Sequence, residues 1–137
     1  MAPPVSPIVL IVDDYPDAIE VWEFYLRSEG FSVLTAADGH VALEKAMNER
    51  PDLVVMDLEL PGLSGYEVAR RLRADSGTCG IPLIAATGCS HEGQLAEARA
   101  IGFDAILVKP CDPAELVLEI RRLIAARDGQ PPSATPA

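Results

Sequence analysis

The stretch Ile8-Val9-Leu10-Ile11-Val12-Asp13-Asp14 decides the fold of this chain. A short, continuous apolar run of this kind is typical of a strand buried on both faces, and two aspartates follow it directly. Three later runs have the same form, a short apolar segment that ends on a polar residue: Leu53–Met56 before Asp57, Leu83–Ala86 before Thr87, and Ala105–Val108 before Lys109 and Pro110. Amphipathic segments separate these runs. Alternating strands and helices predict βαβ units around a parallel sheet.

Five strand–helix units are expected to fill one α/β domain from residue 8 to residue 127. Pro16 is expected at the first position of the first helix, where its missing N–H costs nothing. Asp112 and Pro113 are expected to begin the last helix in the same way. Residues 1–7 and 128–137 are rich in Pro, Gly, Ser and Thr and are expected to be flexible tails. The expected strands are 8–12, 31–35, 53–56, 81–87 and 105–108, and the helices begin near 16, 39, 65, 92 and 113.

Composition narrows the class of partner and the compartment. The net charge of −10 argues against nucleic acid as a direct partner, because phosphate backbones attract Lys and Arg. No apolar run approaches the ~20 residues of a membrane span, and the N-terminus lacks the charged and apolar regions of a signal peptide. Three cysteines form an odd set without metal-like spacing, which favours reduced thiols. The cytoplasm is the expected compartment.

Three carboxylates are expected to meet at one edge of the sheet, because ligands of open parallel sheets bind at the carboxyl ends of the strands. Asp13, Asp14 and Asp57 would then repel one another by about 4 kcal/mol per pair at ~4 Å and an effective dielectric of 20. A hard divalent cation such as Mg2+ is the usual neutralising partner. The alternative is that Asp13 and Asp14 only cap the helix after them. A cap explains one acid, but it does not explain both acids together with Asp57 and Lys109.

The remaining residues at this edge predict phosphoryl-transfer chemistry. The Asp57 carboxylate is a candidate nucleophile, because an aspartate can carry a phosphoryl group as an acyl phosphate. Lys109 supplies a compact positive charge that can reach a phosphoryl oxygen, and the Thr87 hydroxyl can donate to another. Taken alone, Lys109 could be a surface lysine and Thr87 an ordinary strand residue. Their arrival at the same edge as the acids favours the functional interpretation.

These residues resemble the response-regulator receiver domain, the CheY-like family, over about Val9 to Ile124. The motifs that carry the resemblance are Ile11-Val12-Asp13-Asp14, Met56-Asp57-Leu58-Glu59-Leu60-Pro61-Gly62-Leu63-Ser64-Gly65, Ala85-Ala86-Thr87-Gly88 and Leu107-Val108-Lys109-Pro110. Each motif is weak alone, but the set in this order is highly specific. The resemblance implies a flavodoxin-like, doubly wound, five-stranded parallel sheet of order 2-1-3-4-5 in a three-layer α/β/α domain.

The resemblance also implies the role of each acid. Asp57 would accept a phosphoryl group from a phosphohistidine on a sensor histidine kinase or a histidine phosphotransfer protein. Asp14, Asp57 and the main-chain carbonyl of Glu59 would ligate Mg2+ or Mn2+. Asp13 would act on the metal mainly through a bound water. The domain would catalyse only its own phosphorylation and dephosphorylation, and so would not be an enzyme in the usual sense.

Thr87 and Lys109 are expected to couple phosphorylation to a change at the protein surface. In such domains Thr87 and Lys109 read the phosphate, and the surface of the fourth helix, fifth strand and fifth helix shifts in response. That surface would bind a downstream protein, and it allows a homodimer linked to phosphorylation. The family often has Tyr or Phe three residues before the lysine, where this chain has Ile106. An inward-turning aromatic ring is therefore not expected as the switch.

Two other functions compete with this interpretation. An aspartyl-phosphate phosphatase would also use a nucleophilic aspartate, with a second acid two residues later, and Asp57-Leu58-Glu59 has one. It lies on the third strand rather than the first, which disfavours this alternative. A passive interaction module with the receiver fold is the other candidate. The complete set of acids, threonine and lysine makes it the weaker one.

Overall fold

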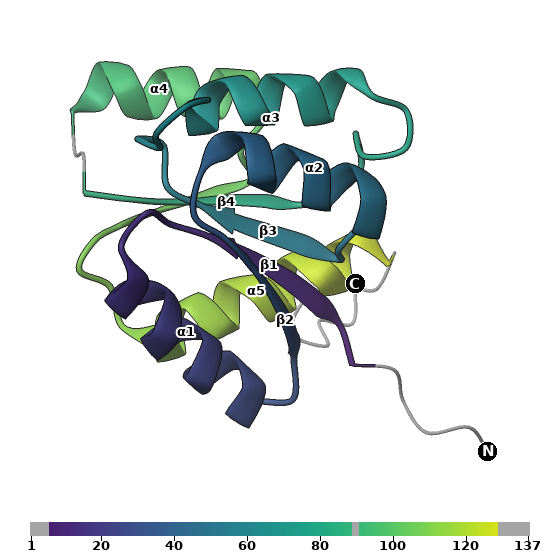
Figure 1. Ribbon diagram of the computed structural model, residues 1–137, viewed down its shortest axis with the longest axis vertical. Helices are drawn as coiled ribbons and strands as arrows, with labels where there is room; N and C mark the ends of the chain where they lie inside the picture. Colours follow the sequence, from purple (N-terminus) through teal and green to yellow (C-terminus); the bar gives the residue numbers. More distant parts are fainter. Residues whose placement is uncertain (1–5, 89–90, 129–137) are drawn as a thin grey trace, which may run out of the picture.

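The computed structural model describes residues 6–88 and 91–128, which form a five-stranded parallel sheet between two layers of helices (Figure 1). The sheet order is β2-β1-β3-β4-β5, as predicted. The strands are β1 (Ile8–Val12), β2 (Ser32–Ala36), β3 (Leu53–Met56), β4 (Leu83–Thr87) and β5 (Ala105–Val108). The helices are α1 (Pro16–Ser28), α2 (Gly39–Glu49), α3 (Gly65–Ala74), α4 (Glu92–Ile101) and α5 (Pro113–Arg127). This is the CheY-like flavodoxin fold.

Two hydrophobic cores lie on opposite faces of the sheet. Successive strand residues point to opposite faces, so Leu10 and Val12 pack under α2, α3 and α4, while Val9 and Ile11 pack under α1 and α5. Figure 1 shows the same division, with α1 and α5 below the sheet and the other three helices above it. Burial on both faces explains why the central strands read as continuous apolar runs.

Two strand boundaries were predicted wrongly. The second strand was expected at 31–35 but spans Ser32–Ala36, because the N–H of Phe31 turns back to the carbonyl of Leu26 at the end of α1, at 3.1 Å. The fourth strand was expected from Ile81 but begins at Leu83, because the N–H of Ile81 closes a turn onto Thr78 at 3.0 Å. The remaining strands lie where the sequence places them.

The helices begin at capping residues that the sequence supplies. The Asp112 side chain accepts the N–H of Ala114 at the start of α5, as expected, and Ser64 accepts the N–H of Glu67 in α3. Pro16 is the first residue of α1, with Tyr15 as its N-cap.

A close backbone contact fixes the long loop after β3. A Cβ atom at Gly39, the first residue of α2, would lie 1.7 Å from the carbonyl oxygen of Leu63. The N–H of Gly39 also donates to the carbonyl of Pro61, at 3.3 Å. Only glycine permits this approach, so α2 holds the loop that leaves the carboxyl end of β3.

None of the helices in residues 6–88 and 91–128 is both long and apolar enough to cross a membrane. β1 begins at Ile8 and α5 ends at Arg127. Of the expected tails, residues 1–5 and 129–137 lie outside the described residues.

Candidate functional site

The sheet itself places three of the predicted site residues. Asp13, Asp57 and Lys109 each follow the last residue of a strand, and each backbone N–H continues the hydrogen bonding of the parallel ladder by one residue. The bonds run from Asp13 N to Ala36 O at 3.1 Å, from Asp57 N to Val12 O at 3.0 Å, and from Lys109 N to Thr87 O at 2.8 Å. Strand pairing therefore brings these residues to one edge.

The three predicted acids form a cluster at this edge. One carboxylate oxygen from each of Asp13, Asp14 and Asp57 lies within 4.8 Å of the other two. Asp13 is buried, with 6% of its surface exposed, while Asp57 is half-buried and Asp14 is exposed. Carboxylate oxygens at this spacing, open to solvent on one side, suit a hard divalent cation that keeps some of its waters.

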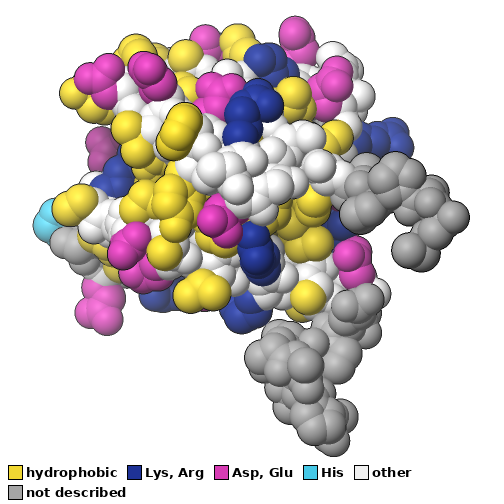
Figure 2. Space-filling model, turned by 90° about the horizontal axis from the view of Figure 1, so that it is seen from below, with side chains coloured by type: hydrophobic (Ala, Val, Ile, Leu, Met, Phe, Trp, Pro, Cys, Tyr) yellow, Lys and Arg dark blue, Asp and Glu magenta, His cyan; other side chains and the backbone are white. Residues whose placement is uncertain are grey.

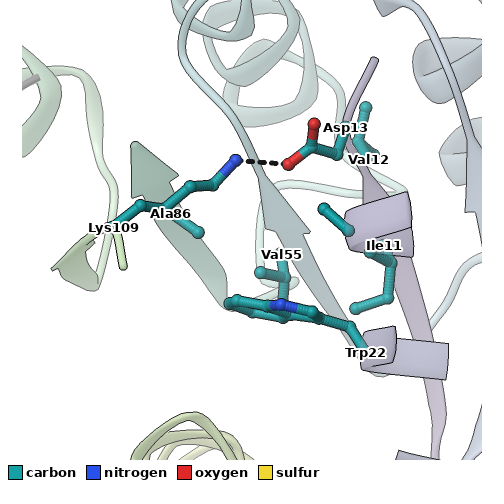
Figure 3. A pocket seen from close by; sticks show the side chains of 8 residues that line it. Ile11, Val12, Asp13, Trp22, Val55, Ala86 and Lys109 are labelled. Carbon is teal, nitrogen blue, oxygen red and sulfur yellow. Dashed lines mark hydrogen bonds and ion pairs between the residues drawn. The ribbon is translucent and has the colours of Figure 1, made fainter. Parts of the chain in front are cut away.

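Lys109 reaches across the edge to two of these acids. Its Nζ donates to Oδ2 of Asp13 and to Oδ2 of Asp57, the latter at 3.2 Å. Figure 3 shows the side chain extended from the end of β5 toward Asp13. Burial alone would lower the pKa of Lys109, but the hydrogen bonds and charges of Asp13 and Asp57 outweigh burial and raise it. One ammonium against three carboxylates leaves two negative charges uncompensated, which one divalent cation would balance.

Backbone donors orient the second oxygen of two carboxylates. Oδ1 of Asp13 accepts the N–H of Tyr15 at 2.9 Å, and Oδ1 of Asp57 accepts the N–H of Glu59 at 3.0 Å. The N-cap of α1 is Tyr15, which makes no side-chain capping bond. Neither Asp13 nor Asp14 is the N-cap of α1, which disfavours the alternative in which they only cap this helix. The hydrogen bond from Glu59 also holds the turn that carries the main-chain carbonyl of Glu59, the third predicted ligand.

Thr87 is the last residue of β4, and it pairs with Val108, the residue before Lys109. Thr87 is fully buried, and its backbone carbonyl accepts the N–H of Lys109. Ile106, at the position where the resemblance leads one to look for an aromatic ring, is half-buried and packs against the core beneath α2, α3 and α4. Both residues are thus linked to the packing of the sheet near the acids.

Sequence reasoning did not identify Trp22 as a neighbour of the site. The indole lies in α1 and lines a small cavity with Asp13, Ala86 and Lys109 (Figure 3). Helical spacing predicts a buried face for α1, but it does not indicate which strand end that face covers. The pairing of α1 with the end of β5 is decided only in three dimensions.

An α/β sheet with three acids, a threonine and a lysine at the carboxyl ends of β1, β3, β4 and β5 defines a receiver-type domain. Residues 9–121 match the sequence profile of the response regulator receiver domain, and the chain belongs to this family.

Known proteins of this family support the assignment. The chain is 37% identical over 123 residues to the DNA-binding response regulator MtrA of Mycolicibacterium smegmatis, covering 90% of this chain and 53% of that protein. It therefore spans about half the length of this curated relative. The receiver domain of a sensor histidine kinase from Pseudomonas aeruginosa, solved with a magnesium ion in its active site cleft, has a TM-score of 0.82 at 35% identity, covering 88% of this chain and 99% of that one. The chemotaxis protein CheY4 of Vibrio cholerae has a TM-score of 0.82 at 31% identity, covering 87% of this chain and 99% of that one.

These matches are to response regulators and receiver domains, so they favour the receiver over the phosphatase alternative.

Proposed function

We propose that Asp57 accepts a phosphoryl group from the phosphohistidine of a sensor histidine kinase or a histidine phosphotransfer protein. The observation that carries the proposal is the meeting of Asp57 with two further acids and Lys109 at the carboxyl edge of the sheet. A nucleophile alone could be a structural aspartate. A nucleophile with a cation site on one side and a fixed ammonium on the other is arranged for phosphoryl transfer.

The transfer step exchanges one bond to phosphorus for another. A carboxylate oxygen of Asp57 forms a bond to phosphorus as the bond from phosphorus to the imidazole nitrogen breaks, and the departing imidazole keeps that electron pair. Lys109 already lies 3.2 Å from Oδ2 of Asp57, so its ammonium can pair with a phosphoryl oxygen carried there. The buried hydroxyl of Thr87 is the proposed second donor to the phosphoryl group.

Asp14, Asp57 and the carbonyl of Glu59 are the proposed ligands of Mg2+, with Mn2+ as a substitute. The bound cation would neutralise charge on the transferring phosphoryl group. Both oxygens of Asp13 accept hydrogen bonds from the protein, one from Tyr15 and one from Lys109. This supports a role for Asp13 through a metal-bound water rather than as a direct ligand.

The proposed output surface consists of α4, β5 and α5. β5 is an edge strand, and Val108, just before Lys109, is 41% exposed. Leu118 of α5 is also exposed, so apolar contacts are available on strand and helix alike. We propose residues 8–127 as the working domain, acting in the cytoplasm on a protein target at this surface. A homodimer formed at the same surface is compatible with this exposure.

The kinase is proposed to dock on α1, which begins directly after the acid pair. Val21 and Phe24 of this helix are exposed, Phe24 by 77%. They line an open hollow of about 580 Å3. Figure 2, seen from the side of α1 and α5, shows hydrophobic side chains lying among acidic ones on this face. A phosphohistidine donor that approaches Asp57 would bury these apolar groups at the same time.

Small-molecule phosphodonors test the central proposal. We expect acetyl phosphate with Mg2+ to add one phosphoryl group, detected as a mass increase on the peptide that contains Asp57. Asp57→Asn should remove this labelling, whereas Asp128→Asn, an isosteric change at the exposed end of α5, should not. A protein that folds, binds Mg2+ and takes no label would support the passive module instead. Labelling of Asp57→Asn at the wild-type rate would place the phosphate elsewhere.

A further inference from the structure

A small, partly open cavity lies beneath the acid cluster. Its volume is about 10 Å3, close to the ~10–15 Å3 needed to hold one water. In Figure 3 Lys109 passes along one side of it toward Asp13, and the Trp22 indole closes the opposite side next to Val55. The lining residues are Ile11, Val12, Asp13, Ala18, Trp22, Val55, Ala86 and Lys109.

A second hollow lies outside this cavity and is open to solvent. It has a volume of about 380 Å3 and is lined by Ala18, Trp22, Lys109, Pro110 and Cys111. Three residues, Ala18, Trp22 and Lys109, border both the cavity and the outer hollow. They form the wall between the inner cavity under the acids and the outer hollow. Trp22 is the largest member of this wall.

Ala18 and Trp22 lie together in this wall. The two residues are four apart in α1, so they lie on the same side of the helix. The methyl group of Ala18 leaves room for an indole, and Trp22 packs against the core formed with Val9, Ile11 and Val55. Lys109, in turn, needs an apolar surface for its stem if its ammonium is to reach Asp13 and Asp57.

We propose that Trp22 is a positioning residue that holds Lys109 over the acid cluster by closing the wall between the inner cavity and the outer hollow. Removal of the indole would join the two spaces. More water would then surround the stem and the ammonium, the attraction between Nζ and the two carboxylates would weaken in the higher dielectric, and the lysine could turn outward. The significance of this for signalling rests on the proposed role of Lys109, but the positioning itself does not.

The lysine content of the chain allows a direct test by NMR. Lys45 and Lys109 are its two lysines, so the ammonium signals of a 15N-labelled sample can be assigned by one substitution. The wild-type protein should show a slowly exchanging Lys109 ammonium, because it is held between Asp13 and Asp57. Trp22→Ala should remove this signal while the Lys45 signal remains. Trp22→Phe, which keeps a ring in the wall, should retain it.

A matched control separates positioning from general loss of stability. Leu26 is fully buried in α1 and belongs to the same core, but it does not line the cavity. Leu26→Val should lower the melting temperature and leave the Lys109 signal intact. If Trp22→Ala fails to fold, Trp22→Leu takes its place. A Lys109 signal unchanged in the folded Trp22 variant, or lost equally in Leu26→Val, would overturn the proposal.

A double-mutant cycle supplies the functional readout. Trp22→Ala should slow acetyl-phosphate labelling of Asp57 by about threefold to tenfold, a coupling usual for contacting residues. In a Lys109→Met background, which keeps the stem and removes the charge, the same change should have little effect. An equal slowing in both backgrounds would mean that Trp22 does not act through Lys109. If no label forms even on the wild-type protein, the phosphoacceptor proposal fails, while the NMR result still decides the positioning.

Discussion

Gly65, the first residue of α3, lies so close to Asp57 that a Cβ atom added to it would fall 2.3 Å from the Asp57 carbonyl oxygen. The N–H of Gly65 also donates to the carbonyl of Leu58, at 3.0 Å. The start of α3 is therefore locked against the backbone of the proposed phosphoacceptor. The loop between them leaves β3 and returns to the same point.

This contact predicts the effect of Gly65→Ala. A methyl group here must displace either Asp57 or the start of α3, so we expect a loss of about 1–3 kcal/mol in the free energy of unfolding, as for overpacked sites. Labelling of Asp57 by acetyl phosphate should slow as well. Gly93→Ala in α4 is the control, since nothing lies within 4 Å of its added Cβ. The Gly93→Ala substitution should stabilise the helix by roughly 0.5–1 kcal/mol. Equal effects of the two changes would contradict the argument.

Magnesium should stabilise the folded protein through the acid cluster. A ligand that binds only the native state adds about 2.7 kcal/mol at a concentration of 100 times its Kd, so Mg2+ should raise the melting temperature measured in EDTA. Asp14→Ala should abolish most of this increment, because an exposed ligand is lost while the fold is barely disturbed. Asp17→Ala removes a nearby exposed charge outside the cluster and should retain it. A magnesium response that survives Asp14→Ala would remove this residue from the ligand set.

Lys109 should be needed to transmit phosphorylation more than to accept it. Lys109→Ala is expected to take label slowly, because the nucleophile and the acids remain. Beryllofluoride, which imitates a phosphoryl group on aspartate, should change the hydrogen exchange of α4 and α5 in the wild-type protein and not in this variant. Asp57→Asn is the negative control, because it cannot carry beryllofluoride and should show the hydrogen exchange of the unmodified protein. The same exchange pattern in Lys109→Ala and wild type would exclude the proposed coupling.

Cys111 predicts a dependence of stability on alkaline pH. Burial, with the charge of Glu115, raises the pKa of this thiol above its ordinary value of 9.0. The folded state therefore keeps a proton that the unfolded chain releases. The resulting stabilisation is complete below about pH 9 and is lost as the pH rises through the folded pKa. Urea titrations should show this alkaline decline, and Cys111→Ala should reduce it. Iodoacetamide should also modify Cys111 more slowly in the folded protein than in urea, as read by peptide mass.

Phe24 should affect transfer from a kinase more than transfer from a small donor. Its side chain is exposed on α1, the proposed docking helix. We compare the rate of Asp57 phosphorylation by a phosphorylated cognate kinase with the rate by acetyl phosphate. Phe24→Ala should lower the ratio of the first rate to the second by about tenfold, which is within the usual range for an apolar contact residue. Leu118→Ala is the matched apolar control, because Leu118 is also exposed but lies on α5. An unchanged ratio for Phe24→Ala would move the docking surface away from α1.

The hydrophobic pattern of the sequence predicts the fold class and most element boundaries, and the resemblance to the receiver family implies the sheet order. Buried strands such as Leu53–Met56 are short apolar runs because both faces are covered, and this pattern can be read without coordinates. The polar residue after each run could also be assigned to one edge, since parallel strands all end on the same side. Asp13, Asp14 and Asp57 do meet there, with Lys109 between two of them.

Tertiary structure alone decided which side chains close the site and how tightly the backbone packs around it. Helical spacing predicts a buried face for α1, but the position of Trp22 beside Lys109 depends on how α1 lies across the ends of the strands. The contacts of Gly39 with Leu63 and of Gly65 with Asp57 join residues brought together only by helix packing. The physical reason is that hydrophobic patterning specifies which face of an element is buried. It does not specify the neighbour against which that face is buried.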